Sequence, residues 1–235
     1  WKRQSRAGGS SIGASVSQAE GMFAAEEIHP MAESTPLTLY YAPRTRSFTA
    51  LWLLEELGVP YALESFDLNG GRNQEPDYLA LNPMGKVPLV VHGERPVSEL
   101  GAIAIYLADR FPGAGLAPGL DDDARPAWLR WLFFASAIME PAYGERFFGW
   151  DVPARSVAWG SFDRMLRVVT EGVTPGPFLL GEAFSAADVH VGATLRFGLL
   201  FGILPKEGPL ADYVARCTAR PAFQRAEAIE ARESE

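Results

Sequence analysis

Cysteine is almost absent from this 235-residue chain, in which Cys217 is the only one. A single thiol excludes an internal disulfide, a Cys-x-x-Cys redox pair and a cysteine-based zinc site. A reducing, cytoplasmic location is therefore expected. The three histidines, His29, His92 and His190, lie far apart and lack the spacing of metal ligands, so we expect no bound metal.

An excess of positive charge is also lacking. The chain has 21 Lys and Arg residues against 29 Asp and Glu, a net charge of −8. Phosphate backbones require a basic surface, so broad nucleic-acid binding is excluded. No apolar run approaches the ~18 residues that mark a membrane-spanning helix. We expect the partners to be small molecules or protein, with neither nucleic acid nor membrane involved.

Composition divides the chain into segments. Residues 1–35 contain Gly8-Gly9-Ser10-Ser11 and no apolar periodicity, which predicts a disordered extension. Met31 lies just before the first expected strand, so we interpret these residues as an added extension. A linker rich in glycine and proline is expected over 112–123. It separates a domain at 36–111 from a second at 124–235.

The first domain alternates strands and helices. We expect strands over 37–41 and 61–67, a helix over 48–57 closed by Gly58 and Pro60, and a short ordered stretch over 77–81. Two further strands are expected around 87–91 and 96–97, followed by a helix over 99–110. This order, βαβ followed by ββα, predicts a thioredoxin-like α/β domain.

The second domain follows the helical period throughout. A helix from Arg125 has apolar residues on nearly every side, and a further helix is expected over 154–171. Ser185 and Asp188 form the pattern of a capping box, with Phe184 and Val189 as its hydrophobic staple. An all-α C-terminal domain is therefore expected.

The passage from Asn82 to Leu107 carries the strongest functional signal. Pro88 withholds an N–H at the start of a strand, so Val87 can offer free backbone groups to an extended ligand. A helix then opens near Glu99, and its unsatisfied N–H groups attract a carboxylate. This combination suits a small anionic peptide.

The same passage resembles the glutathione-binding half of the cytosolic glutathione transferases, of a bacterial type without an active-site cysteine. The resemblance extends over about residues 37–223, and it implies a closing helix over 209–223. It implies an enzyme that joins the glutathione thiolate to a small apolar electrophile, with glutathione as co-substrate, no metal, and a homodimeric assembly. It also implies a cis Val87-Pro88 bond. The glutathione-binding residues would be Lys86, Val87, Pro88, Glu99 and Leu100.

Two points concern the chemistry of the site, and the first is a departure from the family. The family usually has serine at the position of Leu100, so one hydroxyl for the γ-glutamyl carboxylate is missing. The thiol itself must be held as thiolate, and the family places the hydroxyl that does so near the loop from Ala42 to Ser47. We rank Ser47 first, Thr45 second and Tyr41 third as catalytic candidates. Ser47 is equally suited to cap a helix.

Two other functions are also compatible with the sequence. One is a binding protein of the same fold without catalysis, which the leucine at position 100 makes worth considering. The other is a glutathione-dependent isomerase or dehalogenase. Arg44, Arg46 and Lys86 are cations near the expected site that could offset an anionic ligand. The aromatic residues of the second domain are candidate walls for the electrophile and are not assigned.

Overall fold

The computed structural model describes residues 35–235. The expected extension therefore lies outside the described residues, except for Thr35. In the described part no helix is long and apolar enough to cross a membrane.

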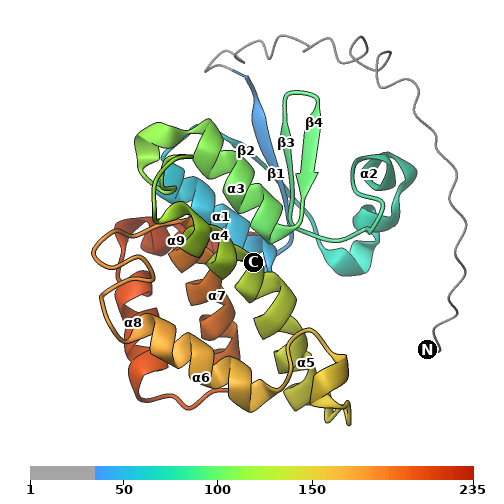
Figure 1. Ribbon diagram of the computed structural model, residues 1–235. Coiled ribbons are helices and arrows are strands. Elements are labelled where there is room, and N and C mark those ends of the chain that lie inside the picture. Colours follow the sequence, from blue (N-terminus) through green and yellow to red (C-terminus); the bar gives the residue numbers. More distant parts are fainter. Residues whose placement is uncertain (1–34) are drawn as a thin grey trace, which may run out of the picture. The chain divides into compact units, whose positions relative to one another are not determined.

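A four-stranded sheet forms the first part of the fold, in the order β2-β1-β3-β4. Strand β1 pairs parallel with β2 and antiparallel with β3, which pairs antiparallel with β4. Helices α1 and α3 lie on one side of this sheet and α2 on the other (Figure 1). The thioredoxin-like prediction is thus confirmed. The strands are β1 (Leu37–Tyr41), β2 (Ala62–Ser65), β3 (Leu89–His92) and β4 (Arg95–Ser98); the helices are α1 (Ser47–Leu57), α2 (Pro76–Leu81) and α3 (Leu100–Arg110), with 3₁₀ turns η1 (Leu68–Gly70), η2 (Arg72–Gln74) and η3 (Pro112–Ala114).

The rest of the fold is helical, as predicted. Its first helix, α4 (Arg125–Phe134), continues through a π-helical segment into α5, so the chain changes helical phase without leaving the helix axis. The elements are α4, the π segment η4 (Ala135–Met139), α5 (Glu140–Phe148), the 3₁₀ turn η5 (Ala154–Ser156), α6 (Phe162–Val173), α7 (Ala186–Leu200), α8 (Pro209–Thr218) and α9 (Pro221–Glu233).

Two expected helix boundaries were wrong. The helix expected over 154–171 begins only at Phe162, because Gly160 has φ 72° and Ser161 caps the helix by accepting from the Arg164 N–H at 3.3 Å. The helix expected over 209–223 is two helices, since Arg220 is extended immediately before Pro221.

The capping box at the start of α7 is confirmed. The Asp188 carboxylate accepts from the Ser185 N–H at 2.9 Å, and also from the Leu179 N–H and the Tyr213 hydroxyl at 2.8 Å each. Burial raises the pKa of Asp188, which the same hydrogen bonds oppose. This carboxylate therefore ties α8 and the preceding turn to α7 and has a structural role.

Helix α1 joins the two parts of the fold. It packs against β1 and α3 on one side and against α7 and α9 on the other. Near its C-terminal end, Glu56 accepts two hydrogen bonds from the Arg220 guanidinium, both at 2.7 Å, and one from Trp52 Nε1 at 3.0 Å. Arg225 donates one hydrogen bond to the Glu55 carboxylate and one to the Glu55 backbone carbonyl, both at 2.7 Å. The sheet domain and the helical domain therefore share one continuous core.

Candidate functional site

The register of the sheet brings three distant segments to one end of it. Tyr40 pairs with Leu89, and Leu89 pairs with Ser98. The next residue outward is Tyr41 on β1, Pro88 before β3 and Glu99 after β4. Two of the expected regions, the Val87-Pro88 bond and the start of α3, therefore lie beside the loop that leads from β1 into α1.

Val87 has the free backbone groups expected for pairing with an extended ligand. The Val87-Pro88 bond is cis, and no backbone partner for Val87 is found among residues 35–235. The preceding carbonyl, of Lys86, is held by the Tyr78 hydroxyl at 2.6 Å and by Asn82 Nδ2 at 2.8 Å. Burial raises the pKa of Tyr78 to about 12, so its hydroxyl remains a donor at neutral pH.

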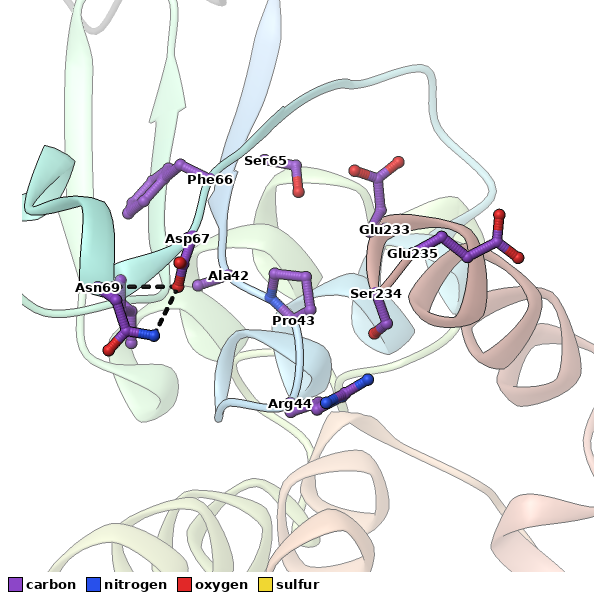
Figure 2. Close-up of a pocket in the computed structure, with 11 residues that line it drawn as sticks. Ala42, Pro43, Arg44, Ser65, Phe66, Asp67, Asn69, Glu233, Ser234 and Glu235 are labelled. Carbon is purple, nitrogen blue, oxygen red and sulfur yellow. Dashed lines mark hydrogen bonds between the residues drawn. The ribbon is translucent and has the colours of Figure 1, made fainter.

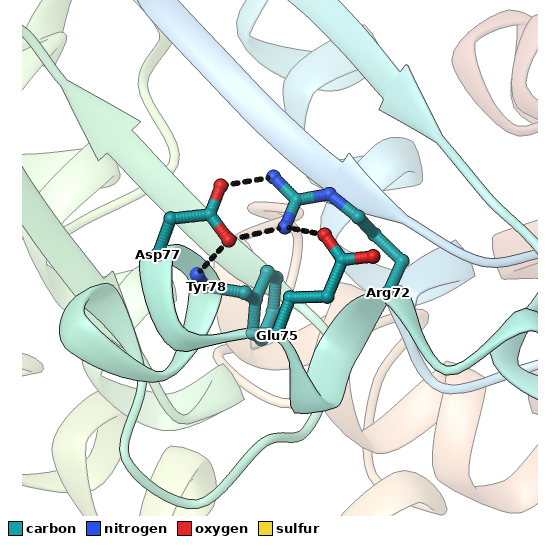
Figure 3. Close-up of polar contacts among 4 residues, drawn as sticks. All are labelled: Arg72, Glu75, Asp77 and Tyr78. Carbon is teal, nitrogen blue, oxygen red and sulfur yellow. Dashed lines mark hydrogen bonds and ion pairs between the residues drawn. The ribbon is translucent and has the colours of Figure 1, made fainter.

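The turn before Val87 is supported by η2 and α2. Arg72 makes two hydrogen bonds to the Asp77 carboxylate and one to Glu75, and Asp77 also accepts from the Tyr78 N–H (Figure 3). This network fixes the start of α2, which carries Tyr78. Gly85 is required in the turn, since its φ is 59° and an added Cβ would lie 2.5 Å from Gln74 Nε2.

Glu99 immediately precedes α3 and has a rare backbone conformation. Its φ is 66° and ψ is 121°, and its side chain makes no capping hydrogen bond. The first N–H groups of α3 are therefore not capped by that side chain and are available to a carboxylate. A strained non-glycine residue at such a position is typical of a functional site. Leu100 is half-buried and contributes only its backbone N–H.

Burial separates the three candidate hydroxyls. Tyr41 is 0% exposed, and its hydroxyl is enclosed without a hydrogen-bond partner among residues 35–235. Ser47 is also 0% exposed, and its hydroxyl donates to the Ala42 carbonyl at 2.9 Å while accepting from the Ala42 N–H at 3.0 Å. Thr45 is half-buried and lines a cavity.

The Thr45 and Ser47 hydroxyls are 2.7 Å apart and form one network. Thr45 Oγ1 donates to the Ala42 carbonyl at 2.7 Å and accepts from the Ser47 N–H at 3.1 Å. Because Ser47 can satisfy the Ala42 carbonyl by itself, Thr45 can turn its proton outward without leaving that acceptor bare. Of the three hydroxyls, Thr45 is the one that geometry leaves accessible.

Two residues of the helical domain hold this loop, and no sequence signal pointed to either. Glu230 on α9 accepts from the Arg44 N–H at 2.8 Å, where Arg44 has φ 60°. Burial raises the pKa of Glu230. Glu140, the first residue of α5, receives two hydrogen bonds from Arg46. Of the three expected cations, Arg46 is therefore already paired, while Lys86 is exposed.

Three cavities border the loop from β1 to α1. A cavity of about 720 Å³ lies between Ala42–Arg44, the residues after β2 and the end of α9 (Figure 2). It is on the β2 side of β1, whereas Val87 and Pro88 are on the β3 side. A cavity of about 230 Å³ is lined by residues that include Thr45, Phe48 and Glu230. A third, of about 420 Å³, is lined by Arg46 and by aromatic residues of α5 and α7.

The two histidines in the described part are buried. His92 Nδ1 lies 2.9 Å from the Tyr106 hydroxyl, and His190 is enclosed in the helical domain, where burial lowers its pKa to about 4. His29 lies outside the described residues. Within residues 35–235 no group of three or more His, Cys, Asp or Glu side chains is arranged to hold a metal ion.

Comparisons with known proteins agree on one family. Residues 35–109 match the family described as glutathione S-transferase, N-terminal domain. The chain is 28% identical over 166 residues to the disulfide-bond oxidoreductase YfcG of Escherichia coli strain K12, covering 65% of this chain and 76% of that protein. It superposes on a glutathione transferase from Methylococcus capsulatus str. Bath with a TM-score of 0.70 and 30% identity, covering 83% of this chain and 98% of that one. A homologue from Sulfitobacter, solved with bound glutathione, gives a TM-score of 0.69 and 26% identity over 83% of this chain and 98% of its own.

Proposed function

The chain belongs to the glutathione transferase family, and we propose that it binds glutathione at the end of the sheet and joins its sulfur to an apolar electrophile. The observation that carries this is the joint position of the free Val87 backbone, the uncapped start of α3 and the Thr45 hydroxyl around one end of β1. No single one of these features would suffice.

Each part of the peptide has a matching group. The unpaired backbone groups of Val87, before the cis bond to Pro88, would pair with the cysteinyl residue of glutathione. The first N–H groups of α3 would receive the γ-glutamyl carboxylate at Leu100, with Glu99 beside its ammonium group. Lys86 is exposed next to this segment and would add positive charge.

Thr45 would donate a hydrogen bond to the sulfur and so favour the thiolate. A hydrogen bond to a charged group contributes about 1.5–3 kcal/mol, which lowers a thiol pKa by about 1–2 units. In this arrangement Ser47 acts behind Thr45, because its own hydroxyl is buried against Ala42. The thiolate then attacks the electrophilic carbon, a C–S bond forms and the leaving group departs with its electron pair.

Thiol–disulfide exchange through a protein cysteine is not favoured by this chain's own residues. Its single cysteine, Cys217, is buried in α8, and burial raises its thiol pKa to about 12. A protein thiol that remains protonated in the core cannot attack a disulfide.

Calorimetry with glutathione tests the binding half of the proposal. We expect a dissociation constant in the micromolar-to-millimolar range, about −4 to −8 kcal/mol. Turnover of benzyl chloride with glutathione tests the catalytic half and separates a transferase from a binding protein. Absence of both heat and thermal stabilisation at saturating glutathione would overturn the proposal.

We also propose that the protein is a homodimer. Two-fold pairing is the commonest assembly of soluble homo-oligomers, and the family resemblance implies it. Helix α4, which is apolar on nearly every side, buries Trp128, Trp131 and Leu132 within its own chain, so its apolar circumference gives no argument for a partner. Light scattering at micromolar concentration decides: about twice 25.6 kDa is expected, and 25.6 kDa would exclude the dimer.

A further inference from the structure

An unusual group of aromatic side chains surrounds the cavity of about 420 Å³. Four of them are largely exposed: Phe147 at 58%, Phe148 at 67%, Trp150 at 47% and Phe201 at 63%. Phe197 completes the group, which we call the aromatic cavity. So much exposed apolar surface in one place is costly in water and marks a binding site for an apolar partner.

The rings are arranged with both faces and edges toward one another. Phe148 and Trp150 are stacked, 5.6 Å apart with 19° between their planes, and Phe197 and Phe201 are stacked at 6.2 Å and 6°. Phe147 stands nearly perpendicular between the two pairs, at 86° to Phe148 and 74° to Phe201. Such a surface offers an aromatic ligand ring contacts that a saturated ligand cannot make.

The charges at the cavity cancel. Arg46 and Glu140 both line it, and they are paired with each other. The Arg46 guanidinium also lies 5.5 Å from the centre of the Phe197 ring. Because these opposite charges offset each other, the cavity's described lining offers no unpaired charge to an ionic ligand and favours a neutral molecule.

The aromatic cavity borders the space in front of the candidate thiol activator. Phe197 and Phe201 line the aromatic cavity, and they also line the cavity of about 230 Å³ whose wall includes Thr45. The π segment ends at Met139, so the change of helical phase precedes the part of α5 that supplies Tyr143 and Phe147 to the cavity wall. A π segment inside a helix is often associated with a functional site.

Resting on the proposed function, we infer that the aromatic cavity selects neutral, planar, multi-ring aromatic electrophiles as the second substrate. Arylmethyl halides represent the class: the sulfur forms a bond to the benzylic carbon, the carbon–halogen bond breaks, and halide leaves with the electron pair while the thiol proton passes to solvent. The rings remain in the aromatic cavity and the reacting carbon points toward Thr45.

Turnover of a matched series tests the inference on the full chain. We measure kcat/KM with glutathione for benzyl chloride, 1-chloromethylnaphthalene and 9-chloromethylanthracene, each divided by its uncatalysed rate constant. From one ring to three, this ratio should rise by about tenfold or more, as expected for two additional ring contacts. A ratio that stays flat or falls would overturn the inference.

Variants assign the selectivity to the aromatic cavity. Phe148→Leu and Trp150→Leu should each flatten the dependence on ring number. Phe133→Leu is the matched control, because Phe133 is 62% exposed on α4 and lines none of the three cavities. Gly144→Ala gives a test that removes no ring, since the added Cβ would lie 2.9 Å from the Trp150 ring and must displace it. Selectivity retained in all three cavity variants would refute the assignment.

A binding measurement separates failure of the inference from failure of the proposed function. The neutral fluorescent probe N-phenyl-1-naphthylamine needs neither glutathione nor turnover. Should no electrophile be converted, the proposed function fails, and the inference then depends on this probe alone. Weakening of probe binding by about tenfold in Trp150→Leu, but not in Phe133→Leu, would support the cavity as an aromatic site. Equal binding to both variants would overturn it.

Discussion

Replacing Ser47 and Thr45 one at a time distinguishes a structural hydroxyl from a catalytic one. In Ser47→Ala, the Ala42 N–H loses its acceptor at 3.0 Å, and Ala42 is only 1% exposed. An unsatisfied buried donor costs about 1–3 kcal/mol. For a protein of this size each kcal/mol lowers the melting temperature by about 2–4 °C, so we expect a loss of about 5 °C.

In Thr45→Val the expected loss lies in the chemistry. The half-buried Thr45 hydroxyl is the donor proposed for the sulfur, and its removal should raise the pKa of bound glutathione by about 1–2 units. The corresponding fall in kcat/KM is about 10- to 100-fold. Thr45→Ser should restore most of both quantities, because it returns the hydroxyl.

Two assays on the same variants give the answer. Thermal unfolding reports the structural effect, and ultraviolet absorbance of the thiolate against pH reports the thiol pKa. A Ser47→Ala protein whose thiol pKa rises more than that of Thr45→Val would refute the reasoning and return Ser47 to first place. A Thr45→Val protein with unchanged pKa and kcat/KM would exclude Thr45 as the activator.

Three further predictions concern the ligand carboxylate, the domain junction and pH. Leu100→Ser should tighten glutathione binding by about 1.5–3 kcal/mol by adding a charge-assisted hydrogen bond, and unchanged affinity in calorimetry would argue against a carboxylate at the start of α3. Arg220→Ala should lower the free energy of unfolding by about 3 kcal/mol, because the Glu56 carboxylate, at 4% side-chain exposure, loses both hydrogen bonds from Arg220. A loss near zero in urea titration would show that the hydrogen bond from Trp52 is enough for the Glu56 carboxylate. The pKa of His190 falls from 6.5 to about 4 in the folded chain, so only the unfolded chain takes up a proton as the pH drops through 6.5. Stability from this group is therefore lost on acidification, by about 2 kcal/mol at pH 5, and His190→Leu should lose correspondingly less between pH 7.5 and pH 5 in urea titrations.

Local sequence signals predicted the parts of the fold that local chemistry determines. Gly58, with φ 66°, ends α1 where a glycine followed by proline predicts an end, and Ser185 with Asp188 begins α7 as a capping box does. The N-terminal boundary of α6 was predicted wrongly, because the local signal there is ambiguous. A glycine inside an apolar pattern is compatible with a continuing helix and with a break, and only the left-handed backbone of Gly160 decides for the break.

Only part of the candidate site could be predicted from local sequence signals. Val87, Pro88 and Glu99 lie within one short passage, so their spacing indicated a binding segment. Glu230 lies 186 positions from Arg44, and Glu140 lies 94 positions from Arg46. No periodicity links residues so far apart, and each looks like an ordinary surface charge until the chain is folded.

These distant contacts make the last helix part of the site. Arg44 has φ 60° without being glycine, a conformation that persists only where the surroundings hold it. The Glu230 carboxylate of α9 accepts from its N–H, and the next residue of the loop, Thr45, carries the hydroxyl proposed for the sulfur. The residue that follows Thr45 in the chain, Arg46, donates two hydrogen bonds to Glu140 of α5. The sheet domain therefore supplies the groups that would bind the peptide, while the helical domain holds the loop that would activate its thiol.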